Sequence, residues 1–242
     1  MQIGFIGLGD LGSRMVNNIL SSTGHEVVAC DASSQAMRAA EALGAETAST
    51  PAAVASSQGA LHTAAIPLAD FLLAAKLLGG PVKVRHGLLI ADARVVITML
   101  PASSAVRDAY LGRNGLIQAS RGLQPSLFID CSTVSPATSQ EIATEVQKCA
   151  LHHEARPFPG CSAAHPAFLD APASGELTAA TAATLTFMVH TSLKSVILTH
   201  TILSPRHRCY DHTVQPGCGR RSSIGRGGAK GGQADIKSLS LT

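Results

Sequence analysis

The sequence contains no tryptophan, few aromatic residues and no long uninterrupted apolar stretch. Aromatic side chains make up 3% of the 242 residues and charged side chains 14%, whereas 45% are hydrophobic. A core must therefore be packed mainly from alanine, leucine, valine and isoleucine. Because no run reaches the roughly 18 apolar residues that a membrane-spanning helix needs, we predict a globular protein with no membrane partner.

The cysteines lack the spacing of a disulfide framework or a metal site. None of the six forms a C-x-x-C pair, which favours reduced thiols in an intracellular protein. Cys209, His212 and Cys218 could be imagined as ligands, but their spacing matches no zinc pattern, so no metal is predicted. The first apolar strand begins almost at Met1, so the sequence indicates no signal or transit peptide.

Charge is distributed unevenly along the chain. Residues 190–242 contain eight Lys or Arg against two acidic residues, although the net charge of the whole chain is only +3. A basic, glycine-rich segment can indicate nucleic-acid binding. This one has a single aromatic residue, Tyr210, and no recognisable module, so we expect an irregular, disordered tail and no nucleic-acid partner.

The first 31 residues contain the most informative pattern. A short apolar run, Ile3-Gly4-Phe5-Ile6, predicts a buried parallel strand and leads into a G-x-G-x-x-G loop, after which apolar residues follow at helical spacing. Such a loop turns tightly at its first glycine, lets a pyrophosphate approach at the second, and lets the helix pack closely at the third. The predicted cofactor-binding residues of the loop are Gly7, Leu8, Gly9, Asp10, Leu11 and Gly12.

Asp31 ends the second predicted strand, residues 27–30, and lies 19 residues after Gly12. A carboxylate about 20 residues beyond the loop binds the adenosine ribose hydroxyls in dinucleotide sites. Its charge would repel a 2′-phosphate, and Ala32-Ser33 provides no arginine to bind one. We therefore predict NAD as the cofactor in preference to NADP. The alternative is an ordinary acidic residue at a strand end.

Strands and helices alternate through the rest of the first 189 residues. Apolar runs at 95–100, 127–130 and 168–170 predict buried strands, and helices are expected at 33–43, 51–55, 102–111 and 135–147. This alternation predicts an α/β fold with a Rossmann-type doubly wound parallel sheet. We expect one NAD-binding domain over residues 1–189.

Two segments, residues 58–90 and 150–167, delay strands that should follow within a few residues, and we expect them to be insertions. Together with the loss of pattern after residue 189, they suggest translated intron sequence and a change of reading frame. Comparing the transcript with the gene tests that hypothesis.

Several ordered blocks together resemble the β-hydroxyacid dehydrogenase family. They are similar to its N-terminal signature, its Leu-Pro loop against the dinucleotide, its Asp-x-Ser-Thr-x-x-Pro segment near the nicotinamide, its substrate loop and the strand that follows. The corresponding residues here are 5–18, 97–101, 129–136, 170–175 and 185–189. The resemblance covers residues 1–57, 91–149 and 168–189.

The resemblance implies a reaction and a set of site residues. The most similar members oxidise 3-hydroxyisobutyrate to methylmalonate semialdehyde with NAD, in valine degradation. By the same resemblance, the nicotinamide contacts would be Leu100, Pro101 and Thr133, and the substrate contacts Ser132, Ser174 and Gly175. A lysine would act as general acid/base on the substrate hydroxyl. Lys237, in a partial match to a Gly-x-Gly-Gln-Ala-Ala-Lys motif, is the candidate, and the alternative is a solvated tail lysine.

The sequence departs from the family at two places. Glu176 stands where the substrate loop has a second glycine, which adds a negative charge beside the expected substrate carboxylate. After Val189 the family continues with a mainly helical domain that completes the site and the homo-oligomer interface. We expect that all-helical domain to be largely absent here.

Several alternatives follow from these departures. The chain could be an active dehydrogenase of a small 3-hydroxy acid, an NAD-binding domain without turnover, or a non-functional truncated product. Eukaryotic members are mitochondrial, which makes the mitochondrion the expected compartment and the cytoplasm the alternative. Ser132 and Thr133 could also merely cap the helix that begins at Pro136.

Overall fold

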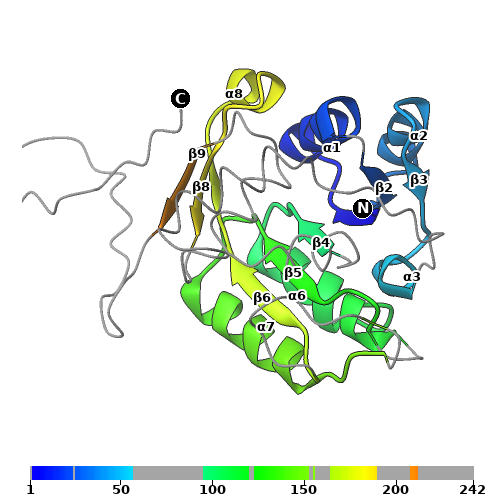
Figure 1. The fold of residues 1–242 in the computed structure, drawn as a ribbon, viewed down its shortest axis with the longest axis vertical. Coiled ribbons are helices and arrows are strands. Elements are labelled where there is room, and N and C mark those ends of the chain that lie inside the picture. The colour runs from blue at the N-terminus through cyan, green and yellow to red at the C-terminus, as the bar shows by residue number, and fades with distance from the viewer. Residues whose placement is uncertain are drawn as a thin grey trace, which may run out of the picture.

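The computed structural model describes residues 2–23, 25–56, 95–119, 123–152, 155, 164–189 and 208–211. Six parallel strands form its main sheet in the order β3-β2-β1-β4-β5-β6 (Figure 1). The order reverses between β1 and β4, which is where ligands bind in sheets of this kind. The strands are β1 Gln2–Ile6, β2 Glu26–Cys30, β3 Glu46–Thr47, β4 Val95–Thr98, β5 Leu127–Asp130 and β6 Ala167–Asp170.

Helices cover both faces of this sheet, because successive strand side chains point to opposite sides. Phe5 packs in an apolar cluster with Ile19 of α1, and the next residue, Ile6, packs in a second cluster with Ile142 of α7. Figure 1 shows α1, α2 and α8 on one side and α3, α6 and α7 on the other. The prediction of a doubly wound sheet is confirmed. The helices are α1 Asp10–Thr23, α2 Ser34–Ala42, α3 Pro51–Ser56, α6 Ser103–Leu111, α7 Pro136–Lys148 and α8 Leu177–Thr181, with a 3-10 turn η2 at Leu116–Gln118.

Local signals account for the ends of the predicted helices. The Ser33 hydroxyl accepts a hydrogen bond from the Ala36 N–H and caps α2, which ends before Gly44 at a positive φ of 97°. Pro136 occupies the first turn of α7 after the capping residue Ser135. The alternative in which Ser132 and Thr133 merely cap this helix is therefore wrong, because Ser135 performs that role.

A smaller sheet, which the sequence pattern does not predict as a unit, follows the main one. It contains β7 Ala173–Ser174, antiparallel to β8 Thr186–Val189, and β9 Arg208–Asp211, parallel to β8. β9 lies inside the 190–242 segment that we expected to be irregular, so that expectation is wrong for these four residues. β9 pairs with the open edge of β8 through backbone hydrogen bonds, and such pairing does not require an apolar periodicity in the sequence.

Other expectations fall outside the described residues. These are the whole of the 58–90 insertion, most of the 150–167 insertion, and the remainder of the tail with Lys237, His212 and Cys218. Within the second insertion, Leu151 forms a parallel bridge with Leu123 and its N–H donates to the Ala164 carbonyl.

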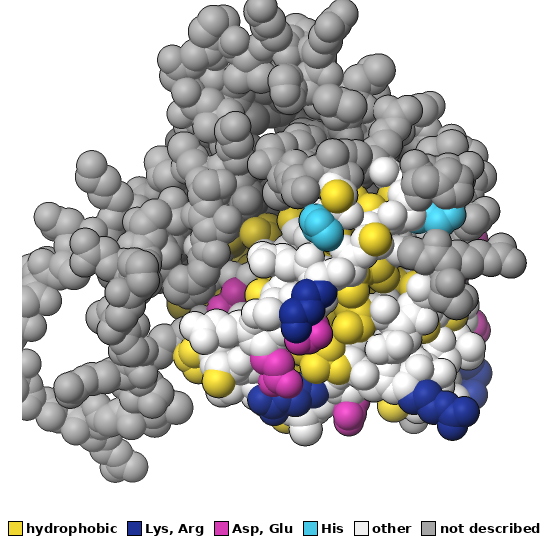
Figure 2. All heavy atoms as spheres, turned by 90° about the horizontal axis from the view of Figure 1, so that it is seen from below, with side chains coloured by type: hydrophobic (Ala, Val, Ile, Leu, Met, Phe, Trp, Pro, Cys, Tyr) yellow, Lys and Arg dark blue, Asp and Glu magenta, His cyan; other side chains and the backbone are white. Residues whose placement is uncertain are grey.

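The described surface carries charges of both signs. Figure 2 views the molecule from the side of α6 and α7, where basic and acidic side chains lie beside one another. Ion pairs on these helices join Arg107 of α6 with Glu141 of α7, at 2.7 Å, and Lys148 with Glu145 within α7, at 2.6 Å. Among the described helices, none has the length and apolar character needed to cross a membrane.

Candidate functional site

The glycine-rich loop connects β1 to α1, and its three glycines have different surroundings. Gly7 has φ of 97°, and a β-carbon there would clash with the carbonyl oxygen of Met99. A β-carbon on Gly12 would clash with the Gly7 carbonyl, so the start of α1 packs directly against the turn. A β-carbon on Gly9 would meet nothing within 4 Å. The loop is therefore crowded behind Gly7 and Gly12 and open in front of Gly9, as a surface that binds a pyrophosphate requires.

The Asp31 carboxylate lies against this loop. Its Oδ2 accepts a hydrogen bond of 2.6 Å from the Leu8 N–H, and its Oδ1 accepts one of 2.7 Å from the Ser33 N–H. These bonds fix the carboxylate at the carboxyl end of β2. Each oxygen keeps a second lone pair for a hydroxyl donor. The predicted acid and the predicted loop are thus brought together.

A depression of about 400 Å³ adjoins these residues between α1 and α2. Its lining includes Leu8, Gly9, Ser13, Ser33, Ala36 and Ala40. Leu8 and Ser33 also donate to Asp31, so the depression and the carboxylate share their supporting backbone. Asp10 is exposed at the start of α1, and Leu11 packs partly against the core. Either residue would contact a cofactor at this position mainly through its backbone N–H.

Two polar residues that the sequence analysis did not identify, Thr98 and Asp130, lie with Ser132 beneath the ends of β4 and β5. Thr98 Oγ1 donates a 2.7 Å hydrogen bond to Asp130 Oδ1, which also accepts the Ser132 N–H at 3.1 Å. Ser132 Oγ accepts the Leu100 N–H at 2.9 Å. Asp130 and Ser132 are fully buried, as is Thr98. Ser132, expected to contact substrate, thus lies inside the protein and supports the β4–α6 loop.

Burial alters the chemistry of this cluster. It raises the pKa of the Asp130 carboxyl, and hydrogen bonds from Ser132 and Thr98 partly oppose that rise. Burial also raises the pKa of Tyr110 well above its usual value, so that hydroxyl stays protonated. The Tyr110 hydroxyl is 3.3 Å from Thr98 Oγ1. Asp130 Oδ2 has no hydrogen-bond partner among the described residues.

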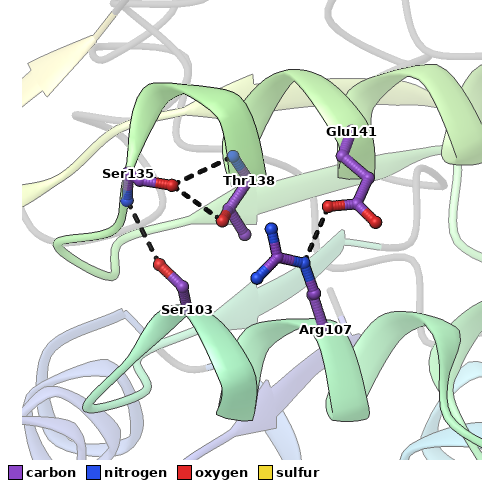
Figure 3. Close-up of polar contacts among 5 residues, drawn as sticks. All are labelled: Ser103, Arg107, Ser135, Thr138 and Glu141. Atoms are coloured by element: carbon purple, nitrogen blue, oxygen red, sulfur yellow. Dashed lines mark hydrogen bonds and ion pairs between the residues drawn. The ribbon is translucent and has the colours of Figure 1, made fainter.

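The segment after β5 is fixed to α6 by polar contacts at the starts of two helices (Figure 3). The Ser135 N–H donates to Ser103 Oγ at 3.2 Å, and Ser135 Oγ accepts the Thr138 N–H at 3.2 Å. Farther along the same pair of helices, Arg107 Nε donates to Glu141 at 2.7 Å. Thr133, between Ser132 and this cap, is exposed, as a residue that touches a cofactor must be.

The predicted substrate loop lies at the same edge of the sheet. Ser174 and Gly175 are exposed, and Gly175 has φ of 146°. The loop is joined to the end of β5 because the Ala173 N–H donates to the Cys131 carbonyl at 3.0 Å. Glu176 precedes α8 without a side-chain capping bond. The structure therefore brings the loops after β1, β4, β5 and β6 to one edge, as parallel strands dictate.

Lys237, the candidate acid/base, lies outside the described residues, within which Lys148 at the end of α7 is the only lysine. No cluster of three or more possible metal ligands occurs in the described parts of the chain. The open face of Gly9 and the position of the Asp31 carboxylate suit a dinucleotide at the glycine loop.

Comparison with known proteins supports this geometry. Residues 2–69 and 83–213 match the family described as the NAD binding domain of 6-phosphogluconate dehydrogenase. The Arabidopsis thaliana protein named "Probable 3-hydroxyisobutyrate dehydrogenase, mitochondrial" is 36% identical over 188 residues, which are 78% of this chain and 42% of that protein. The Homo sapiens 3-hydroxyisobutyrate dehydrogenase, mitochondrial, is 31% identical over 77% of this chain and 40% of its own length.

A solved structure agrees in fold. The Mycobacterium tuberculosis 3-hydroxyisobutyrate dehydrogenase with L-serine superposes with a TM-score of 0.58 and 26% identity, covering 87% of this chain and 54% of that one. The chain thus spans about half the length of the relatives it matches.

Proposed function

This chain belongs to the family of the NAD binding domain of 6-phosphogluconate dehydrogenase, and from that premise we propose that it is the nucleotide-binding half of a β-hydroxyacid dehydrogenase-type oxidoreductase. Membership confirms the predicted family resemblance and the predicted cofactor, NAD. The observation that supports the proposal most directly is the loop that is open only in front of Gly9, with the Asp31 carboxylate 2.6 Å from the Leu8 N–H.

The proposed roles follow from that geometry. The free N–H groups at the start of α1 would bind the pyrophosphate, and Asp31 would accept the ribose hydroxyls and disfavour a 2′-phosphate. Leu100, Pro101 and Thr133 would border the nicotinamide, while Ser174 and Gly175 would hold the substrate carboxylate. When bound, NAD supplies the hydride acceptor of the reaction. This chain's own residues hold the two partners and keep their geometry.

The finer proposal concerns substrate, pathway and place. We propose oxidation of 3-hydroxyisobutyrate to methylmalonate semialdehyde, as in valine degradation, in the mitochondrion and in a homo-oligomer. The names of the relatives support the substrate and the compartment. L-serine, named with the Mycobacterium structure, is the second acid to assay. Fluorescent tagging tests the compartment, and light scattering tests the oligomer.

A second candidate is an NAD-binding domain without turnover. It is favoured by Glu176, which directly follows Ser174 and Gly175 and adds a negative charge beside the place where the substrate carboxylate would bind. In the first candidate, Lys237 would exchange the hydroxyl proton of the substrate. The Lys237→Ala variant would then lose turnover, whereas the matched Lys230→Ala variant would not. Equal turnover in both variants would remove Lys237 from the proposal.

The deciding experiment is thermal unfolding of the purified chain with and without NAD. A ligand at about 100 times its Kd stabilises a protein by about 2.7 kcal/mol. The unfolding temperature should therefore rise clearly with NAD and rise less with NADP. Turnover of 3-hydroxyisobutyrate added to that shift would support the dehydrogenase, and its absence would support the binding domain. A cooperative transition that NAD leaves unchanged would contradict both candidates. Absence of a cooperative transition would support the non-functional product.

A further inference from the structure

A chain of buried hydrogen bonds connects the ends of β4 and β5. Thr98 Oγ1 donates its only proton to Asp130 Oδ1 at 2.7 Å, so the Tyr110 hydroxyl at 3.3 Å must donate to Thr98. Asp130 Oδ1 also accepts the Ser132 N–H. Finally, Ser132 Oγ accepts the N–H of Leu100 at 2.9 Å. This series of hydrogen bonds therefore begins at Tyr110 in α6 and ends on the backbone of the β4–α6 loop.

The side chains joined by these hydrogen bonds are also fixed by strand pairing, ring packing and burial. Thr98 and Asp130 are partners in the parallel register of β4 and β5. The Tyr110 ring lies against Phe128 and Phe168, with centroids 5.9 Å away in each case. All four polar side chains are fully buried. Hydrogen bonds in such a low-dielectric setting are strong, and they allow the joined groups little freedom.

The last hydrogen bond of this series, from the Leu100 N–H, lies next to the predicted nicotinamide contacts. Leu100 and Pro101 form the loop that the Ser132 hydroxyl holds, and exposed Thr133 directly follows Ser132. One buried hydroxyl thus fixes the spacing between the two loops that would border the nicotinamide. Ser132 itself is too deep to touch a ligand.

Asp130 is unfavourable for the stability of the folded state at this buried position. Its Oδ2 has no hydrogen-bond partner among the described residues, and a buried acceptor without a partner destabilises the folded state. A buried carboxyl of this kind is weak support for stability, because well-packed apolar residues often do better. Its Oδ1, by contrast, joins β4 to the segment after β5.

We propose that Ser132 and Asp130 are positioning residues for the nicotinamide end of the site, acting through the Leu100 N–H and without touching the cofactor. The proposal rests on the proposed binding of NAD. It assigns Ser132 a role other than substrate contact. Loss of these hydrogen bonds should weaken binding of the nicotinamide half of NAD and not of the adenosine half. The hydrogen bonds of Asp31 beside the glycine loop, from the Leu8 and Ser33 N–H groups, are separate from them.

The test compares NAD with ADP-ribose, which lacks the nicotinamide, by calorimetric titration of the full chain. In Ser132→Ala we expect the Kd of NAD to rise by about tenfold, equivalent to about 1.4 kcal/mol, and the Kd of ADP-ribose to change by less than about twofold. Ser126→Ala is the matched control, since Ser126 Oγ is also buried but has no partner among the described residues. It should leave both affinities unchanged.

A second variant covers the case in which Ser132→Ala does not fold. Thr98→Val is nearly isosteric and breaks the chain one link earlier, so it should raise the Kd of NAD by about threefold with ADP-ribose unaffected. If the wild-type chain binds neither ligand, the proposed function is wrong and this inference falls with it. If the wild type binds both, but the folded variants weaken both equally or neither, only the positioning role is overturned.

Discussion

The side-chain amide of Asn18 in α1 donates a 2.7 Å hydrogen bond to the main-chain carbonyl of Ala180 in α8. Four residues earlier in α1, Arg14 Nε donates to Thr181 Oγ1 at 3.1 Å. The helix that begins at the glycine loop is therefore bonded to the helix that follows Ser174 and Gly175. Any movement of α8 relative to α1 would change the distance between the cofactor loop and the predicted substrate loop.

Replacing Asn18 by aspartate should destabilise the protein. The variant has almost the same shape but places a carboxylate oxygen against a carbonyl oxygen, so the bond is lost and two acceptors face each other. We expect a loss of about 1–3 kcal/mol in the free energy of unfolding, measured by urea denaturation. Asn17→Asp is the matched control, because Asn17 is exposed on the same helix. Equal losses in both variants would show that the α1–α8 bond is unimportant.

Alanine at Gly9 should separate folding from cofactor binding. A β-carbon at Gly9 meets nothing within 4 Å, so Gly9→Ala should keep the wild-type unfolding temperature in the absence of ligand. The same β-carbon would occupy the space into which the pyrophosphate must come. We expect the Kd of NAD to rise by at least about tenfold in calorimetric titration.

Gly44→Ala should show the opposite of Gly9→Ala, namely a lower stability and an unchanged affinity for NAD. Gly44 also lies in open space, but its φ of 97° is unfavourable for alanine, which should lower stability by about 1 kcal/mol without changing NAD affinity. If Gly9→Ala bound NAD normally, the phosphate would have to bind elsewhere.

The sequence predicted the parts of this site that depend on neighbouring residues. The glycine loop, the acid at the end of β2 and the order of strands each leave a local pattern, and the structure brings Asp31 to within 2.6 Å of the Leu8 N–H. The roles of the individual residues stay predictions. Lys237 lies outside the described residues.

Contacts between distant residues left no comparable signal. Thr98 and Asp130 are 32 positions apart and meet only because β4 and β5 pair in one particular register. Asn18 and Ala180 are separated by 162 positions. Thr98 in β4 and Asp130 in β5 were each the one polar residue of an otherwise apolar strand, and those two irregularities were the available clues. Strands as short as β7, with two residues, carry no periodicity at all.

Acid should destabilise the protein through His25. Burial lowers the pKa of His25 from 6.5 to about 4, and its Nδ1 has no hydrogen-bond partner among the described residues. Between these two values the unfolded chain binds more protons than the folded one, so stability is present above pH 6.5 and is lost as the pH falls. Because the ring is partly exposed, we expect a loss of about 2 kcal/mol and not the full value implied by the shift.

Urea denaturation of His25→Gln against the wild type measures this effect. The raised pKa of Asp130 acts in the opposite sense, since it makes the folded state bind its proton more tightly and lowers stability as the pH rises through that region. That contribution is common to both proteins and cancels in their difference. A difference in the free energy of unfolding that stays constant with pH would rule out His25 as the source.

Two of the contacts in Figure 3, the Arg107–Glu141 ion pair and the Ser135 cap, should contribute different energies. Arg107 and Glu141 are 44% and 42% exposed, so solvent screens their attraction and Glu141→Gln should cost less than about 0.5 kcal/mol. Ser135 Oγ accepts the Thr138 N–H, which has no partner within its own helix turn, so Ser135→Ala should cost about 1 kcal/mol.

Ser135→Thr keeps the capping hydroxyl and should recover most of the loss caused by alanine, as measured by urea denaturation. Added salt should reduce any effect of Glu141→Gln and leave that of Ser135→Ala intact, because only the first depends on a screened charge pair. If the charge pair cost more than the cap, the junction of α6 and α7 would be held by the exposed ion pair. The loop with Thr133 would then become sensitive to ionic strength. With the larger loss at Ser135, that loop is fixed by the helix cap and its position is independent of salt.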